Sequence, residues 1–510
     1  MRPTRHVRLT RRQVLQGAGA AAGAALIGAA GGRAIAGLGD RSRRIRDASA
    51  LRAGSVRRFV SRPDLRPPAV DVAGPQAPGN VPPETEGLLF LGPGRKDGAQ
   101  GGPLIVDRSG ELVWFKPLPS RLWGANFGVW QLESQSVLAW WEGTIEVPLG
   151  YGRGEAVVLD SSYRERYRIR AANGQVMDVH ELQLTPEGTA LFTCHPRAVA
   201  TDLSELGGPR RGRVLESVIQ ERDIRSGRLL LEWRSLDHVP VTESYRSMEE
   251  PYDYLHVNSI EIAPDGHLLI SGRHTWALYK LHRRTGEVIW RLGGKRSDFG
   301  LDQQARFTWQ HDARQLDART ISLFENGSDG RTRTRPQSRG LVLDVDASAR
   351  RVRVRGDYRH PRALRSAAMG SVRVLPTGRV LVGWGDQPYA TKFDGDGDLA
   401  SDTMLPRGQQ SYRSLCLPWS GSPRERPAIA ARRTRRTGAT TVYVSWSGAT
   451  EVSSWQISAQ PHNGGLVPVA VVPKRGFETP ITVATANGHV VATALDDSGQ
   501  PLASSEPLRL

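Results

Sequence analysis

Two stretches of the chain, Asp178-Val-His-Glu-Leu-Gln-Leu-Thr-Pro-Glu-Gly188 and His256-Val-Asn-Ser-Ile-Glu-Ile-Ala-Pro-Asp-Gly266, align without a gap. Each begins with alternating polar and apolar residues, the pattern of a half-buried strand, and ends in a proline-acid-glycine turn. A second apolar run follows each turn, at 190–193 and 268–271. Both stretches therefore predict a β-hairpin, and their likeness predicts that this hairpin is repeated along the chain.

Three further segments fit the same hairpin frame, at 128–140, 311–324 and 370–382. A second type of hairpin alternates with the first, and its six candidates begin at 104, 157, 221, 278, 341 and 392. Two hairpins make a four-stranded blade, and a spacing of about 40 to 70 residues per unit is typical of a β-propeller with long loops. The one missing inner hairpin is expected from pairing Leu88-Leu-Phe-Leu91 with the late segment 412–419.

The predicted fold class is therefore all-β, with a six-bladed β-propeller over residues 84–425. After an arginine-rich linker at 426–439, short alternating strands fill residues 440–510. Strands of this length, separated by turns over about seventy residues, predict a small C-terminal β-sandwich of the immunoglobulin or fibronectin type III kind.

Cysteine is rare, because only Cys194 and Cys416 occur among the 510 residues. This count excludes a disulfide-rich framework and a zinc or iron-sulfur site held by cysteines alone. Both cysteines lie in predicted strands, so we expect buried thiols.

The net charge of +17 is unevenly distributed along the chain. Fifteen arginines against three aspartates give residues 1–67 a surplus of +12, and six arginines against one glutamate give residues 424–436 a further +5. The remaining chain is therefore neutral. Nucleic-acid-binding proteins concentrate basic charge on a folded face, so this distribution argues against nucleic acid as a partner.

The first residues read as an export signal. Thr10-Arg11-Arg12-Gln13-Val14-Leu15 is a twin-arginine (Tat) pattern, an alanine- and glycine-rich run follows, and Ala34-Ile35-Ala36 offers small residues for cleavage. We expect residues 1–36 to be a cleaved Tat signal peptide and the mature protein to be secreted or held in the cell envelope of a bacterium, with no stable membrane span. A retained N-terminal anchor is the alternative. Residues 37–83, rich in arginine, proline and glycine, are expected to be a linker or arm.

Polar residues recur at equivalent positions of the repeated hairpins. Counting eight residues back from the turn residue reaches His180, Asn258 and His311, and His256 lies two residues before Asn258 on the same strand face. Because the inner strands of a propeller line its central channel, we expect these side chains to converge. Arg273, at the far end of the hairpin that His256 begins, is expected to join them.

Two chemistries can use such a ring of histidines. Neutral imidazoles can hold a metal ion, as in a metal-dependent oxygenase or hydrolase. Alternatively, histidine acts as nucleophile or proton shuttle while asparagine and arginine donate hydrogen bonds to an anionic group being transferred. A permanent cation such as Arg273 is poorly placed beside a metal ion and well placed beside a sulfate or phosphate, which favours the second reading.

Several segments resemble the arylsulfotransferase family, in particular its secreted actinobacterial and fungal branch. The most specific are Asp178 to Leu191, Asn258-Ser-Ile, Ser271-Gly-Arg-His-Thr275, Trp290 to Phe299 and Gln310-His-Asp-Ala-Arg314. The resemblance implies a six-bladed propeller that moves a sulfuryl group between phenols without a nucleotide sulfate donor, and without a metal or other cofactor.

The same resemblance implies roles for individual residues. His311 resembles the histidine that takes the sulfuryl group as a transient sulfohistidine, while His180 and His256 resemble the flanking histidines for proton transfer and sulfate binding. Asn258 and Arg273 resemble the donors to the sulfuryl oxygens. The implied partners are phenols, aryl sulfates and the Tat export machinery. A family member that only binds an aromatic ligand is the other alternative.

Overall fold

Strands and tight turns alternate along the part of the chain that the computed structural model describes, which is residues 56–75, 87–147, 149–433, 439–460, 464–483 and 488–510. These residues lie in one compact unit, Asp47–Leu510. Among the described residues the architecture is all-β, as predicted, apart from single turns of 3-10 helix at η2 (Ser204–Leu206), η3 (Ser235–Asp237) and η4 (Val241–Glu243). Over the described ranges, no helix has the length and apolar character needed to cross a bilayer. The expected signal peptide lies outside the described residues.

Three of the sheets have four antiparallel strands each, in the orders β13-β14-β15-β16, β17-β18-β19-β20 and β25-β2-β3-β4. Their strands are β13 (Val257–Ile262), β14 (Leu268–Gly272), β15 (Ala277–Leu281), β16 (Val288–Gly293), β17 (His311–Gln315), β18 (Thr320–Glu325), β19 (Arg339–Asp346), β20 (Arg351–Tyr358), β25 (Leu415–Leu417), β2 (Leu88–Leu91), β3 (Leu104–Val106) and β4 (Leu112–Phe115).

Two larger sheets contain the remaining predicted hairpins, in the orders β12-β11-β10-β9-β7-β6-β5, with β8 paired to β7, and β1-β24-β23-β22-β21. Their strands are β5 (Trp123–Leu132), β6 (Gln135–Glu146), β7 (Tyr151–Leu159), β8 (Glu165–Ile169), β9 (Met177–Leu184), β10 (Thr189–Thr201), β11 (Gly212–Asp223), β12 (Leu229–Arg234), β1 (Asp71–Ala73), β21 (Ser371–Val374), β22 (Val380–Gly383), β23 (Tyr389–Phe393) and β24 (Leu399–Met404).

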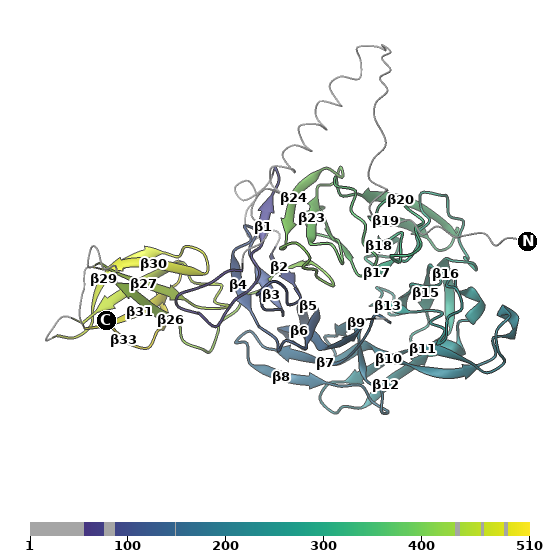
Figure 1. The fold of residues 1–510 in the computed structure, drawn as a ribbon, viewed down its shortest axis with the longest axis horizontal. Coiled ribbons are helices and arrows are strands. Elements are labelled where there is room, and N and C mark those ends of the chain that lie inside the picture. Colours follow the sequence, from purple (N-terminus) through teal and green to yellow (C-terminus); the bar gives the residue numbers. More distant parts are fainter. Residues whose placement is uncertain (1–55, 76–86, 148, 434–438, 461–463, 484–487) are drawn as a thin grey trace, which may run out of the picture. The chain divides into compact units, whose positions relative to one another are not determined.

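The first strands of successive hairpin pairs contact one another. Strand β9 contacts β5 and β13, β13 contacts β17, and β17 contacts β21, while β25 contacts β5 and β22. The sheets consequently follow one another around a common centre, as Figure 1 shows. Apolar side chains fill the space between neighbours; for example, Leu269 and Leu278 share one core cluster with Ile321 and Leu343 of the next sheet.

Strands from the two ends of this region pair with each other, as the sequence predicts. Leu88, Leu89 and Phe90 of β2 are the register partners of Leu417, Cys416 and Leu415 of β25. The prediction of buried thiols is also confirmed, since Cys194 and Cys416 are both buried and free. One sheet is thus completed by segments from opposite ends of the region.

The repeated turns explain why glycine recurs at the end of each aligned stretch. Gly188, Gly266 and Gly378 have φ angles of 84°, 78° and 79°. Only glycine adopts this left-handed region without steric cost, so it is the favoured residue at these hairpin turns.

The C-terminal residues form two further sheets, β26-β27-β30 and β29-β28-β31-β32, with β33 paired to β31. Both contribute to one hydrophobic core that includes Val444, Trp455, Ile481 and Ala492. The strands are β26 (Ala428–Arg433), β27 (Thr440–Ser445), β28 (Ser454–Ala459), β29 (Val467–Pro473), β30 (Glu478–Val483), β31 (His489–Leu495), β32 (Pro501–Ser504) and β33 (Leu508–Arg509). Because β26 pairs with β27, this sheet takes in residues that we expected to belong to the linker.

Part of the expected N-terminal arm is also folded onto its neighbours. Strand β1 adds to the edge of β24, and Leu65 is 2% exposed. Ser61 donates its backbone N–H to Glu478 at 2.6 Å, and the rings of Phe59 and Phe477 lie 4.5 Å apart. Residues 56–75 are therefore a packed arm.

Candidate functional site

All five residues singled out in the sequence are buried at the inner ends of three neighbouring hairpins. His180 lies in β9, His256 directly precedes β13, Asn258 lies in β13, Arg273 directly follows β14, and His311 begins β17. Each is less than a tenth exposed. The hairpin repeat places them together because each occupies the same end of its own hairpin.

His180 and His256 are in direct contact through their Nε2 atoms, 3.1 Å apart. Each Nδ1 faces a carboxylate, Asp178 Oδ2 at 2.5 Å and Asp253 Oδ2 at 2.7 Å. With both Nδ1–H groups donated to carboxylates, the contact between the Nε2 atoms is a hydrogen bond only when one ring carries a second proton. Burial lowers the pKa of His256 to about 4, despite the opposing charge of Asp253, so the imidazole of His256 is neutral at neutral pH.

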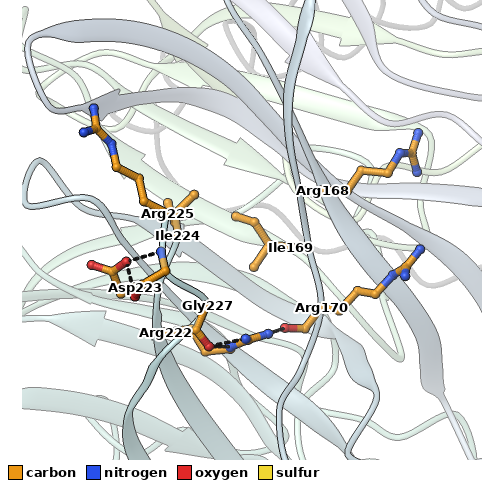
Figure 2. Close-up of a pocket in the computed structure, with 9 residues that line it drawn as sticks. Arg168, Ile169, Arg170, Arg222, Asp223, Ile224, Arg225 and Gly227 are labelled. Carbon is orange, nitrogen blue, oxygen red and sulfur yellow. Dashed lines mark hydrogen bonds between the residues drawn. The ribbon is translucent and has the colours of Figure 1, made fainter.

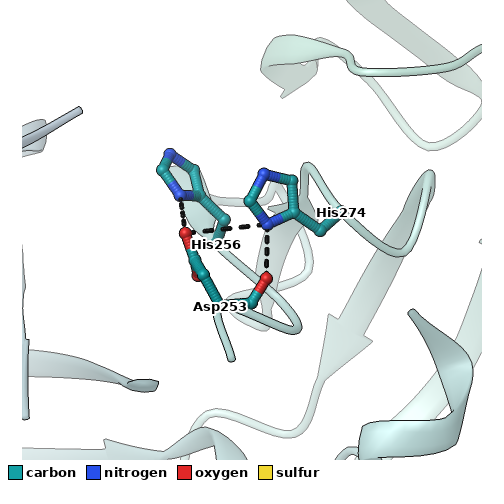
Figure 3. Close-up of side chains that lie close together, drawn as sticks. All are labelled: Asp253, His256 and His274. Carbon is teal, nitrogen blue, oxygen red and sulfur yellow. Dashed lines mark hydrogen bonds and ion pairs between the residues drawn. The ribbon is translucent and has the colours of Figure 1, made fainter. Parts of the chain in front are cut away.

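Asp253 organises this half of the site, although the sequence analysis did not identify it. Its Oδ1 accepts a hydrogen bond from Tyr151 Oη at 2.9 Å, and its backbone carbonyl accepts one from His274 Nδ1 at 2.6 Å. Figure 3 shows His256 and His274 both turned toward Asp253. Burial opposes ionisation of this carboxyl, but His256 and His274 outweigh that effect and hold its pKa well below its ordinary value.

Arg273 lies beside these groups, and two of its guanidinium nitrogens donate hydrogen bonds to the protein. Its Nη1 donates to His274 Nε2 at 2.8 Å and its Nη2 donates to the carbonyl of Ala367 at 2.9 Å. The guanidinium carbon also lies 5.2 Å from the ring centre of Trp309. Arg273 is thus a buried positive charge held within the histidine cluster.

His311 is held in one tautomer by its two neighbours. Its Nδ1 donates to Asn326 Oδ1 at 2.6 Å, and its Nε2 accepts the backbone N–H of Met369 at 3.2 Å. Burial, and then the positive charge of Arg273, lower the pKa of His311 well below its ordinary value. His311 is therefore a neutral imidazole whose Nε2 carries a lone pair, as a nucleophile at neutral pH requires.

Asn258 has a different surrounding from the one its expected role suggests. Its Nδ2 donates to the backbone carbonyl of Gln310 at 2.7 Å, and its Oδ1 has no hydrogen-bond partner among the described residues. The hydrogen bond from Asn258 Nδ2 holds Gln310, the residue that precedes His311. One N–H of the side-chain amide is left for a ligand.

Three residues missed in the sequence, Asp253, His274 and Asn326, complete the cluster. Asn326 directly follows β18 just as Arg273 directly follows β14. The residue that follows the second strand of a hairpin could therefore have been used to predict site residues. We used this position to identify Arg273 but not Asn326. Asp253 lies in a loop before β13, and no repeat position points to it.

Asp253, His256 and His274 could also offer one ligand atom each to a metal ion, since suitable atoms lie within 4.8 Å of one another. However, both Nδ1 atoms face Asp253, and Arg273 donates to the remaining nitrogen of His274. A guanidinium on a prospective ligand opposes binding of a second cation. The arrangement fits a hydrogen-bonded relay better than a metal site.

A cavity of about 360 Å³ opens elsewhere, over β8 and the turn between β11 and β12, and none of the five predicted residues lines it. Arg168, Arg170, Arg222 and Arg225 line it, as Figure 2 shows. Their guanidinium groups are bound by protein acceptors, such as Glu155 for Arg168 and the carbonyl of Gly227 for Arg222. We therefore place the candidate site at the histidines.

One comparison with known proteins identifies a family. The arylsulfotransferase (ASST) family model matches residues 128–404, which include all five predicted residues. No curated protein matches the chain.

Among solved structures, the chain is similar to a protein of unknown function from Bacteroides caccae, with 12% identity, a TM-score of 0.40, and coverage of 65% of this chain and 99% of that one. It is also similar to a virginiamycin B lyase from Staphylococcus aureus, with 9% identity, a TM-score of 0.34, and coverage of 68% and 99%. We draw nothing about function from likenesses at these TM-scores.

Proposed function

This chain belongs to the arylsulfotransferase family, and we propose that it moves a sulfuryl group from an aryl sulfate ester to a second phenol through a sulfohistidine at His311. The observation that carries the proposal is the state of His311: Nδ1 is tied to Asn326, the ring is neutral, and the charge of Arg273 lies close enough to lower its pKa.

In the first half-reaction, the backbone N–H of Met369 releases Nε2 of His311. The freed lone pair attacks the sulfur, the bond from sulfur to the aryl oxygen breaks, and the phenolate leaves. The proton shared by His180 and His256 neutralises that phenolate. In the second half-reaction, a new phenol returns its proton to this pair and attacks the sulfur, the N–S bond breaks, and His311 regains its lone pair. No nucleotide donor is required at any step.

Arg273 and Asn258 supply hydrogen bonds to the sulfuryl oxygens. A sulfuryl group in transfer spreads negative charge over its three equatorial oxygens, by analogy with phosphoryl transfer, so fixed donors contribute more than a strong base. To bind the sulfate, Arg273 Nη2 exchanges its bond to the carbonyl of Ala367 for one to a sulfuryl oxygen.

We place the aryl ring against Trp309 and Trp276. The ring centres of these tryptophans lie 5.4 Å apart at an angle of 70°, and Trp309 lies 5.7 Å from His274. Both indole N–H groups lack a partner among the described residues. An aromatic ligand is favoured here because offset and edge-to-face ring contacts stabilise it beyond simple burial.

The architecture that we propose for this function is a six-bladed propeller over 84–425 followed by a C-terminal β-sandwich of immunoglobulin or fibronectin kind. The contacts between first strands and the pairing of β2 with β25 support the ring, with the eight-stranded sheet counted as two blades. We further propose that the Tat pathway exports the protein to the cell envelope or the medium.

The experiment that tests the proposal is a burst measurement with a chromogenic aryl sulfate. We expect release of one phenol per enzyme, then turnover only when a second phenol is added, and one sulfuryl group on a peptide containing His311 by mass spectrometry. His311→Ala should lose both the burst and the label. A burst and label retained in that variant would overturn the assignment of His311.

Two other outcomes separate the alternatives. Loss of activity on adding a chelator, with stoichiometric metal in the purified protein, would support a metal enzyme built on Asp253, His256 and His274. Binding of aromatic ligands with no turnover of any aryl sulfate would identify a binding protein.

A further inference from the structure

A cluster of buried charges lies directly beside the histidines. Glu181 follows His180 and Asp312 follows His311, and these carboxylates are 0% and 1% exposed. A β-bulge interrupts the pairing of β17 between His311 and Arg314, and Asp312 has a φ of 55°. Bulges re-aim side chains next to active sites, and this one allows two consecutive residues to be buried in the same region.

Arg413 connects the two carboxylates from a distant part of the sequence. Its Nη1 and Nη2 donate to the two oxygens of Glu181 at 2.6 and 2.9 Å. Its Nε forms an ion pair with Asp312 Oδ1 at 2.9 Å without a hydrogen bond. Its Nη2 also lies 3.1 Å from the backbone carbonyl of His180. The guanidinium of Arg413 thus contacts the backbone of His180 and the side chains of Glu181 and Asp312. Glu181 directly follows His180, and Asp312 directly follows His311.

Arg314 repeats the connection from β17. Its Nη2 pairs with Glu181 at 2.6 Å and with Asp312 at 2.9 Å, and its Nη1 pairs with Glu261 at 2.7 Å. Arg373 adds a further ion pair to Asp312. Three arginines therefore face three carboxylates, and the cluster is neutral.

Stability alone does not account for such a cluster. Burying ions costs several kcal/mol each, and well-packed apolar side chains of similar volume often serve a fold equally well or better. Bidentate arginine pairs do provide fixed geometry, because the planar guanidinium holds its acceptors at set positions. The neighbouring reaction needs fixed geometry, since a displacement of about 1 Å at a reacting group can cost about 100-fold in rate.

We propose that Arg413 is a positioning residue, which sets the distance between His180 and His311 by holding Glu181 and Asp312. It touches no reacting atom. The expected effect of Arg413 on the reaction rate rests on the proposed sulfuryl transfer. Its expected effect on the positions of His180 and His311 does not depend on that proposal.

The test is Arg413→Lys, which keeps the charge but lacks the planar guanidinium that holds Glu181 in bidentate fashion while pairing with Asp312. We expect the rate constant of the phenol burst to fall about 10- to 100-fold, the burst amplitude to stay at one per enzyme, and KM for the donor to change less than about threefold. The matched control is Arg283→Lys, because Arg283 also pairs with both oxygens of a buried glutamate, Glu221, at 2.5 and 3.3 Å. The control should lose thermal stability without losing burst rate.

A second readout is independent of activity. In protein with isotope-labelled histidines, we expect the side-chain NMR signals of His180 and His311 to shift in Arg413→Lys and to stay in place in Arg283→Lys. If the wild type shows no burst with any aryl sulfate, the proposed function fails and these signals alone decide the positioning role.

Unchanged burst rate and unchanged histidine signals in folded Arg413→Lys would overturn the inference. If that variant does not fold, the charge-neutral double variant Glu181→Gln with Arg413→Gln replaces it, with the same expected shifts. Failure of both variants to fold would show that the cluster serves folding, which also overturns the positioning role.

Discussion

Several side chains at the site are held in strained backbone conformations. His256, Trp276, Trp309, Asp312 and Met369 all have positive φ angles, between 51° and 62°. Residues other than glycine rarely adopt this region, and each instance costs of the order of 1–3 kcal/mol. At these five positions, side-chain direction is therefore maintained at the expense of stability, while other residues with positive φ angles, such as Glu133 and Arg350, lie in turns elsewhere.

The bond between Asn326 and His311 predicts how the site responds to pH. Asn326→Asp places a carboxylate beside Nδ1 of His311, and its negative charge stabilises the imidazolium and raises the pKa of that ring. The nucleophile is then protonated over more of the neutral range, so the acid limb of the burst-rate profile should move to higher pH. An acid limb at the wild-type position would contradict the role of this bond. Asn173→Asp, at an exposed position, is the control.

His256 predicts a loss of stability in mild acid. Its pKa is about 4 in the folded chain and about 6.5 when unfolded, so the unfolded state binds more protons between these values and stability falls as pH drops through this window. The full effect of a shift of this size is roughly 3 kcal/mol. Denaturant unfolding at pH 7 and pH 4.5 should show a smaller drop for His256→Asn than for the wild type. Equal drops in the two proteins would contradict this linkage.

At the scale of elements, the hairpin is the unit that positions the side chains of the site. Strand β17 carries His311, Asp312 and Arg314 within four residues, and its partner β18 ends next to Asn326. Strand β9 carries His180 and Glu181 in the same way. Substitutions inside these hairpins should therefore affect activity more than equally buried substitutions in outer strands.

The pairing of β2 with β25 predicts that one short strand stabilises the whole region. Phe90 is fully buried in β2 and its ring lies 5.2 Å from that of Phe127. Phe90→Ala should lower the free energy of unfolding by about 3–5 kcal/mol, the usual cost of such a cavity, in urea denaturation. Val469→Ala, at a half-exposed position of β29, should change it by less than about 0.5 kcal/mol. A small effect of Phe90→Ala would show that β2 is dispensable.

The sequence was sufficient for the hairpins and for His180, His256 and His311, because they follow a repeat that can be counted. Alternating strands and a glycine turn predicted the pairing of β9 with β10, and the one missing inner hairpin predicted the pairing of β2 with β25; both are confirmed. The eight-residue offset reached His180, Asn258 and His311. Asp253 was missed because it lies in a loop outside the repeat. Arg413 lies in the predicted late segment 412–419, but it was missed because its contacts arise only when distant strands meet.

At the scale of the whole molecule, most of the net positive charge lies near the N-terminus. The body that contains the site is neutral, while the +12 surplus lies in residues 1–67, which include both the twin-arginine pattern and arginines of the packed arm such as Arg57 and Arg62. Cleavage of the expected signal peptide would remove the six arginines of residues 1–36.

The twin-arginine pattern predicts a specific export defect. Replacing both Arg11 and Arg12 with lysine should leave full-length precursor inside the cell, because the pathway recognises the arginine pair. Replacing Arg2 and Arg5 with lysine is the control and should leave export unchanged. Both are measured by comparing precursor and mature protein in cell and medium fractions. Normal secretion of the Arg11 and Arg12 variant would point to another route.

The partnership of β2 with β25 also has a consequence for the order of events during synthesis. Domains tend to fold as the chain leaves the ribosome, but β2 emerges early and must wait for Leu415–Leu417 before its sheet can be completed. Pairing over so long a separation is slow, since loop closure precedes the gain from the contacts. Strand β2 is thus among the last to be secured, so a machinery that exports only folded proteins, such as the Tat pathway that we propose, would meet this sheet either completed or not formed.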